Sequence, residues 1–167
     1  GLWAMQCVAH GADTILFFRW RSCLMGTEQY WHGILPHNGE PGRYYREIKA
    51  FMDQAGPWME EMQGAMPPKE AAILFSYEQD YAFAIQPHHP DLRYTQHLMT
   101  YYGALHRKHI PTDFVRENDD WSGYKVLIAP LQFLMTPELS AKLHAYVAGG
   151  GRLVLDFRCG VKDAHNL

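Results

Sequence analysis

Apolar residues along the chain follow two different periods, which predict where helices and strands lie. From Leu2 to Ala9 they recur at helical spacing, and Gly11 follows where a helix would end. The run from Thr14 to Trp20 is β-branched, aliphatic and aromatic, with a charged residue only near its end. It is too short for a typical helix and is typical of a fully buried strand. We therefore predict a helix over residues 2–9 and a strand over residues 14–20.

A longer helical pattern begins at Arg43, after a loop of turn-forming residues. Its apolar residues recur at alternating steps of three and four: Tyr45, Ile48, Met52, Ala55, Met59 and Met62. We expect them to pack as one face on a core, a simpler interpretation than a methionine-lined cofactor site. Gly56-Pro57 interrupts the pattern. We expect a break or kink there, because proline lacks the backbone donor and clashes with the preceding turn.

Two successive prolines, Pro67 and Pro68, fit neither a helix nor a central strand. We take residues 64–70 as a linker between a first region, residues 1–63, and a second region, residues 71–167. The first region holds one predicted buried strand. Since such a strand needs neighbours on both sides, we expect this region to be part of a larger sheet.

The second region alternates strands and helices. We predict buried strands at 71–76, 113–115, 125–130 and 152–157, an irregular connection over 77–89, and a helix from Pro90 to His109. Another helix starts at Thr136-Pro137, a cap followed by proline at the first helical position, and ends at Gly149-Gly150-Gly151. This order predicts an α/β fold with a parallel sheet and helices on both faces, in the flavodoxin arrangement. Residues 161–167 stop where a further element is expected.

Composition narrows the classes of function. The net charge is −3 and no basic block is present, so nucleic acid is not an expected partner. No apolar run approaches the roughly 18 residues of a membrane span, so no membrane partner is expected. Cys7, Cys23 and Cys159 are far apart and odd in number, which favours a reducing, cytoplasmic compartment over a disulfide framework. Because the chain opens at Gly1 and not at methionine, the missing signal peptide does not argue against export.

The candidate chemistry follows the first predicted strand. Glu28 and His32 are four residues apart, so they share one face if this stretch is helical. A carboxylate and an imidazole bind polar ligands. Trp20 shares a strand face with Phe18 and Leu16, which makes it a candidate pocket floor. The alternative for Glu28 and His32 is a solvated pair on a helix, a common outcome at this spacing.

Three other groups carry polar or reactive side chains. His88-His89 lies between two prolines, but no second cluster stands at ligand spacing, so we expect a surface loop and no metal. Cys159 precedes Gly160 at a strand end, as the nucleophile of an amidotransferase would, yet a nucleophile elbow needs glycine on both sides. A loop at the carboxyl edge of a sheet is where ligands or partner subunits dock. In the connection after residue 76, the candidates for such a contact are Glu78, Asp80 and Tyr81.

Two blocks of sequence are distinctive beyond their periodicity. The first comprises Ala9-His10-Gly11-Ala12-Asp13, Phe17-Phe18-Arg19-Trp20-Arg21 and Gly26-Thr27-Glu28-Gln29-Tyr30-Trp31-His32-Gly33. The second comprises Ala72-Ile73-Leu74-Phe75-Ser76-Tyr77-Glu78, Ser122-Gly123-Tyr124-Lys125-Val126-Leu127-Ile128-Ala129-Pro130, Gly149-Gly150-Gly151-Arg152-Leu153-Val154 and Gly160-Val161-Lys162-Asp163. In this order they resemble the end of the catalytic barrel and the trimerisation domain of the glycoside hydrolase family 42 β-galactosidases.

For the first region, the resemblance implies that residues 14–20 form the eighth strand of a TIM barrel, whose carboxyl end faces the active site. It implies that Phe18 lines the sugar subsite. It also implies that Glu28 and His32 hydrogen-bond the galactose hydroxyls, with either Trp31 or His32 in the place of the family histidine. The two glutamates of the retaining mechanism, about 5 Å apart, are then expected upstream of Gly1. The chain alone should be inactive, with Phe18, Trp20, Glu28 and His32 as substrate-binding residues and no cofactor.

For the second region, the resemblance implies an incomplete trimerisation domain, similar in fold to class I glutamine amidotransferases, within a homotrimeric enzyme that hydrolyses β-galactosides. Two alternatives stand beside it. One is a flavodoxin-like interaction module without a catalytic role, and the other is a cysteine-dependent, amidotransferase-like enzyme. Without neighbouring barrel strands, the apolar face and edge of the first region should be exposed, and the region should pack less firmly than in a whole enzyme.

Overall fold

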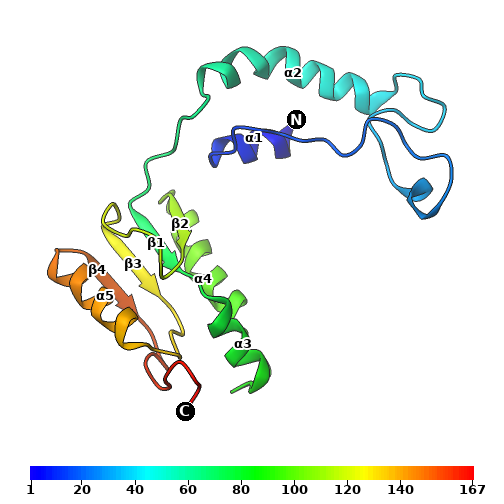
Figure 1. Ribbon diagram of the computed structural model, residues 1–167. Helices are drawn as coiled ribbons and strands as arrows, with labels where there is room; N and C mark the ends of the chain where they lie inside the picture. The colour runs from blue at the N-terminus through cyan, green and yellow to red at the C-terminus, as the bar shows by residue number, and fades with distance from the viewer. The chain divides into compact units, whose positions relative to one another are not determined.

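The computed structural model describes every residue from Gly1 to Leu167 and divides the chain into two compact units (Figure 1). The division falls between Pro67 and Pro68. The first unit, Gly1–Pro67, is poor in regular structure, whereas the second, Pro68–Leu167, is built around one sheet. Each unit is described by itself.

The first unit holds two α-helices and one short 3₁₀ helix: α1 (Leu2–Ala9), η1 (Thr27–Tyr30) and α2 (Arg43–Glu61). The helix over residues 2–9 is confirmed with the predicted bounds. The strand predicted over residues 14–20 is wrong, because this segment has no regular structure and its backbone is paired only at its end. There Arg19 and Trp20 accept from Ile34 and Leu35, and the next residue, Arg21, forms an isolated bridge with Leu35. A strand needs a neighbour for its backbone groups. In this unit, only residues 33–35 lie alongside, and they reach only its end.

Apolar surface stays uncovered in the first unit. Its buried apolar residues are few: Ala4, Val8, Leu35 and Ala55. By contrast, Leu16 is 89% exposed, Trp3 83% and Met25 77%. This agrees with the expectation that an apolar run without barrel neighbours leaves its face open to solvent.

Helix α2 differs from its sequence-based description in two ways. It runs unbroken through Pro57, so the predicted break is wrong. Pro57 is exposed, and water can therefore satisfy the carbonyl of Asp53 that proline leaves without a donor. The predicted apolar face is also only partly covered, because Ala55 is its one buried residue while Met52 and Met62 stay more than 40% exposed.

The second unit is a four-stranded parallel sheet in the order β2-β1-β3-β4. Its strands are β1 (Ala71–Leu74), β2 (Thr112–Val115), β3 (Val126–Ala129) and β4 (Arg152–Leu155). Each lies within or one residue beyond a predicted strand. The predicted parallel α/β sheet is confirmed, and its order is that of the flavodoxin arrangement.

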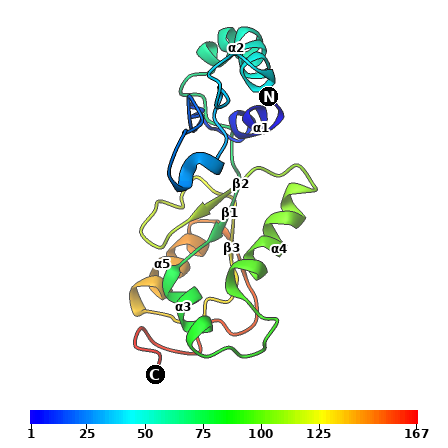
Figure 2. The same cartoon turned by 90° about the vertical axis from the view of Figure 1, so that its right-hand side faces the viewer.

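Helices cover both faces of this sheet (Figure 2). Successive strand residues point to opposite faces. Thus Ala72, Leu74, Leu127 and Ala129 pack with α5 (Pro137–Ala148) in one core. Ile73 and Ile128 pack in the other core with α3 (Tyr77–Ile85) and α4 (Tyr94–His106).

The helix boundaries correct two predictions. Residues 77–89 are not an irregular connection, since α3 occupies Tyr77–Ile85. The sequence carries a capping pattern that explains it: the Ser76 hydroxyl accepts a hydrogen bond from the backbone N–H of Gln79 at 3.5 Å. Helix α4 begins at Tyr94, four residues after the predicted start at Pro90. Helix α5 confirms its prediction, with Thr136 accepting from the N–H of Leu139 at 3.0 Å.

Candidate functional site

The candidate sugar site is built on two short segments that lie side by side. The backbone N–H groups of Ile34 and Leu35 donate to the carbonyls of Arg19 and Trp20 at 2.8 and 2.7 Å. The N–H of Ser22 donates to the carbonyl of Leu35 at 3.0 Å. These bonds join the ends of a loop, residues 23–32, which carries η1 and Glu28. Although residues 14–20 are not a strand, their last two residues are held by backbone pairing.

The backbone of Gly33, at the end of this loop, lies very close to the backbone of Arg21 and Ser22. A Cβ at Gly33 would lie 2.5 Å from the backbone nitrogen of Ser22 and 2.6 Å from the carbonyl carbon of Arg21. No side chain fits at such distances from backbone atoms, which cannot swing away as the end of a side chain can. The N–H of Gly33 also donates to the Ser22 hydroxyl at 2.9 Å, and Ser22 is buried. Ser22 and Gly33 therefore hold the base of the loop.

Arg19 contacts both Glu28 and Phe18. Its guanidinium forms an ion pair with the carboxylate of Glu28. The guanidinium carbon also lies 5.0 Å from the centre of the Phe18 ring, within the range of a cation–π contact. The Arg19 side chain is 16% exposed and that of Glu28 is 60% exposed, so the cation lies beneath an accessible carboxylate.

Trp20 and His32 meet the first turn of α2. The Trp20 ring lies edge-on to that of Tyr45 at 6.2 Å between centres, and the His32 ring lies 6.3 Å from that of Tyr44. Because Tyr44 and Tyr45 are consecutive, the two predicted site residues approach the same helix start. Both remain exposed, Trp20 at 62%. Of the predicted site residues, Phe18 and Glu28 thus share a contact with Arg19, and Trp20 and His32 contact consecutive residues of α2.

The prediction that Glu28 and His32 share a helix face is wrong. The 3₁₀ helix ends at Tyr30, and Trp31 is extended, with φ −91° and ψ 149°. A 3₁₀ helix has three residues per turn and seldom continues beyond one turn, so residues four apart do not align on it. The common strand face proposed for Trp20, Phe18 and Leu16 likewise has no strand to support it.

Polar contacts fix the far side of the loop. The imidazole of His37 is bonded through Nε2 to the carbonyl of Gln29 at 2.8 Å. Beside Arg19, the Cys23 thiol receives a hydrogen bond from the backbone N–H of Met25, and this bond with the neighbouring guanidinium lowers its pKa. None of residues 23–32 is buried. Hydrogen bonds, and not packing, therefore hold the polar groups of this loop in place.

This arrangement suits binding of a polyhydroxylated ligand better than hydrolysis. Exposed aromatic faces contact the C–H face of a sugar, while carboxylate and imidazole groups bond its hydroxyls. Glu28 is the one carboxylate among these residues, whereas a retaining glycosidase uses two, roughly 5 Å apart. The sequence analysis missed Arg19, Ser22 and Gly33. Arg19 carried a usable indication, since a cation at the end of an apolar run needs an anionic partner.

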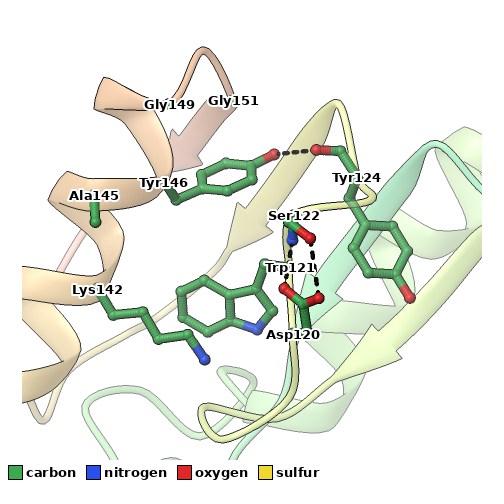
Figure 3. Close-up of a pocket in the computed structure, with 9 residues that line it drawn as sticks. All are labelled: Asp120, Trp121, Ser122, Tyr124, Lys142, Ala145, Tyr146, Gly149 and Gly151. Carbon is green, nitrogen blue, oxygen red and sulfur yellow. Dashed lines mark hydrogen bonds between the residues drawn. The ribbon is translucent and has the colours of Figure 1, made fainter.

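A cavity of about 280 Å³ lies in the second unit, between α5 and the segment that precedes β3 (Figure 3). Aromatic and polar side chains line it, but their polar groups are already engaged. The Lys142 ammonium donates to the carbonyls of Glu117 and Asp119 and lies 4.0 Å from the centre of the Trp121 ring. The Tyr146 hydroxyl donates to the carbonyl of Tyr124 at 2.9 Å. These contacts fix the β2–β3 connection onto α5, a structural role.

Cys159 does not have the surroundings of a nucleophile. Its thiol lies 3.6 Å from the carbonyl of Ala129 and 3.8 Å from the carboxylate of Asp156, and burial raises its pKa. Asp156 instead bonds the His97 imidazole at 2.6 Å and accepts from the N–H of Leu131 at 2.7 Å. A reactive cysteine needs a neighbour that stabilises the thiolate, and a carboxylate does the opposite. The geometry argues against the amidotransferase-like alternative.

The remaining candidates from the sequence lie on or near α3. His88 packs against the rings of Phe83 and Phe133, and burial lowers the pKa of its imidazole. On α3 itself, Tyr81 is 61% exposed. The neighbouring carboxylates have partners within the unit, since Glu78 accepts from the Ser76 hydroxyl at 2.6 Å and Asp80 from Thr95 at 3.4 Å.

Comparison with known proteins identifies the family to which the chain belongs. A family model described as the β-galactosidase trimerisation domain matches residues 69–167, and a second, described as β-galactosidase, matches residues 1–56. The first alone covers more than half of the chain. The chain belongs to the β-galactosidases of glycoside hydrolase family 42. The resemblance seen in the sequence is thereby confirmed.

Individual members of the family agree along the whole chain. β-Galactosidase BgaA of Clostridium cellulovorans is 36% identical over 99% of this chain and 25% of that protein. The crystal structure of the β-galactosidase from Bacillus circulans sp. alkalophilus is 30% identical, with a TM-score of 0.93 over 99% of this chain and 25% of that one. The enzyme of Halorubrum lacusprofundi, 38% identical, has a TM-score of 0.89 over 99% of this chain and 24% of that one. The chain thus spans about a quarter of the length of these family 42 relatives.

None of the helices combines the length and the apolar character that crossing a membrane requires.

Proposed function

We propose that this chain is part of a retaining β-galactosidase that hydrolyses terminal β-D-galactosides. In this proposal, residues 1–63 are the end of the catalytic barrel, residues 64–70 a linker, and residues 71–167 an incomplete trimerisation domain of a homotrimer. The two family models that match residues 1–56 and 69–167 carry the proposal. A cytoplasmic location belongs to it, supported by three cysteines that are all free of disulfides.

The chain's contribution to the reaction is substrate binding through Phe18, Trp20, Glu28 and His32. The contact between Arg19 and both Phe18 and Glu28 supports a shared site for the first two. The approach of Trp20 and His32 to one helix start supports a second wall. In this proposal both the acid/base and the nucleophile glutamate lie in the part of the barrel outside residues 1–63, because retention needs a pair of carboxylates roughly 5 Å apart and the site in this chain holds one carboxylate.

A chimera tests this proposal. The matching quarter of Clostridium cellulovorans BgaA is replaced by this chain, and hydrolysis of an aryl β-galactoside is measured. The expected result is turnover by the chimera and none by the 167-residue chain alone. Replacing Glu28 with glutamine should raise KM by about tenfold or more, because a hydrogen bond to a charged group is worth roughly 1.5–3 kcal/mol.

The matched control is Glu47→Gln. Glu47 is a glutamate of the same unit, paired with Arg43 on the surface of α2 at 3.4 Å. It should leave KM unchanged, because exposed pairs at this spacing contribute little. A folded, active chimera in which Glu28→Gln behaves like Glu47→Gln would remove the sugar-binding role.

A further inference from the structure

The carboxylate of Glu28 is held by a residue outside the set proposed to touch the sugar. We propose that Arg19 is the positioning residue of the site, setting the orientation of the Glu28 carboxylate and the Phe18 ring toward a galactoside. This inference rests on the proposed function, because it assumes that Glu28 meets the sugar. It adds a residue that acts through Glu28, without contact to the ligand.

Arg19 lies on the fixed part of the site and Glu28 on the less fixed part. The carbonyl of Arg19 accepts from the N–H of Ile34 at 2.8 Å, so its backbone is tied into the base of the loop. Glu28 lies in η1, whose N-cap has no side-chain hydrogen bond, within a loop that buries none of its residues. Packing therefore does little to orient Glu28. The ion pair with Arg19 joins it to the base.

The contacts leave the carboxylate able to bind a ligand. Arg19 pairs with Oε2 of Glu28, so Oε1 remains available to accept from a hydroxyl. A guanidinium has donors in a fixed plane and no acceptor, so it fixes the carboxylate without competing for the sugar's donors. The same cation lies over the Phe18 ring, which couples the aromatic wall to the carboxylate. The Arg19 side chain is 16% exposed, whereas Phe18 and Glu28 are both exposed, so these two groups are more accessible to a ligand than the cation.

Cys23 offers a way to follow Arg19 that needs no sugar. Its thiol is held by the N–H of Met25 and lies against the Arg19 guanidinium, and both lower its pKa. The rate at which a thiol reagent labels Cys23 as the pH rises therefore reports the position of the cation. Cys7, exposed on α1, is the matched thiol within the same unit.

The first experiment is a double-mutant cycle in the BgaA chimera, with Arg19→Met, Glu28→Gln and the double variant. We expect Arg19→Met to raise KM for an aryl β-galactoside by about as much as Glu28→Gln, roughly tenfold, with a smaller change in kcat. The double variant should be no worse than Glu28→Gln alone, because a positioning residue has nothing to act on once its carboxylate is gone. Arg19→Lys should recover part of the loss, since it keeps the charge without the planar fork.

The control is Arg46→Met, which removes an arginine of α2 whose guanidinium bonds the carbonyl of Pro41 at 3.0 Å. It should leave KM unchanged. Additive effects in the cycle, or a silent Arg19→Met beside a damaging Glu28→Gln, overturn the inference and leave the proposed function standing. A silent Glu28→Gln in an active chimera removes the sugar contact itself.

The second experiment uses the 167-residue chain as it is. Labelling of Cys23 by iodoacetamide is followed by mass spectrometry across pH 6 to 10. In Arg19→Met the midpoint for Cys23 should move to higher pH, with a smaller move in Arg19→Lys and no change at Cys7. Circular dichroism checks that the helices persist. An unchanged Cys23 profile in a folded Arg19→Met chain overturns the placement of Arg19, whatever the chimera does.

Discussion

The two units of this chain are made of similar residues but bury them differently. In the second unit, Ala72, Ile73, Leu127 and Ala129 have no exposed surface at all. In the first unit, Leu16 and Phe18, in an equally apolar run, are 89% and 72% exposed. The difference shows that an apolar run forms a strand only where neighbouring strands pair with its backbone and helices cover its side chains.

The physical reason is that backbone hydrogen-bonding groups find partner strands in the second unit and few partners in the first. The strands of the second unit bond with neighbours in register, and helices cover both faces, as a parallel sheet requires. In the first unit, residues 14–18 have no strand beside them, and the backbone is paired only where residues 33–35 come near. Burial of apolar surface, the main stabilising term in folding, is therefore concentrated in the second unit.

The largest expected contrast comes from truncating one leucine in each unit. Leu127→Ala should destabilise the second unit by about 2–5 kcal/mol, because Leu127 has no exposed surface and its truncation leaves a cavity in the core. Leu16→Ala should change stability by less than about 0.5 kcal/mol, as surface substitutions do. Urea unfolding followed by circular dichroism measures both. Equal losses would mean that the first unit buries residue 16 in solution.

A smaller, local effect is expected at Gly33. Alanine there would collide with the backbone of Ser22 and Arg21, so the base of the loop must open. Hydrogen exchange at the amides of Ile34 and Leu35 should become about tenfold faster, corresponding to roughly 1.4 kcal/mol. The amide of Ile128 in β3 should keep its rate. Loss of protection in β3 would show that the two units unfold together.

The N-caps of α5 and α2 allow the two units to be compared by substitutions that have smaller effects on stability. Thr136→Ala removes the cap of α5 and should cost about 1 kcal/mol. The N-cap of α2 is Gly42, which makes no side-chain bond, so Gly42→Ser should stabilise that helix by a few tenths of a kcal/mol at most. Thermal unfolding monitored at 222 nm gives both changes. If Gly42→Ser raised stability by more than Thr136→Ala lowered it, the expected order of the two effects would be wrong.

A further effect concerns alkaline pH and the second unit. Burial and a hydrogen bond to the carboxylate of Asp113 raise the pKa of Tyr124 to about 12 from its ordinary value of 10.0. Since the fold favours the neutral phenol, this stabilisation is complete below pH 10 and is lost between pH 10 and about 12. Tyr124→Phe should flatten the dependence of unfolding free energy on pH in that interval, as measured by urea unfolding at several pH values. A variant that keeps the slope of the unaltered chain would contradict the assignment.

Local sequence patterns predicted most of the second unit. Thr136-Pro137 predicted the start of α5 and three glycines its end, because caps and breakers act over a few residues. The same kind of pattern, Ser76 three residues before Gln79, marks α3 and was overlooked. Among the predicted site residues, Phe18 and Glu28 each contact Arg19, a residue that no spacing rule indicated.

The sequence by itself determined the α/β pattern of the second unit and the family resemblance, because both depend on residue order over short stretches. Only the tertiary structure decided whether residues 14–20 are a strand, that Arg19 contacts both Glu28 and Phe18, and why position 33 must be glycine. Those outcomes depend on which groups come close in space. Pairing partners and backbone clashes involve residues about ten or more positions apart, which periodicity cannot relate.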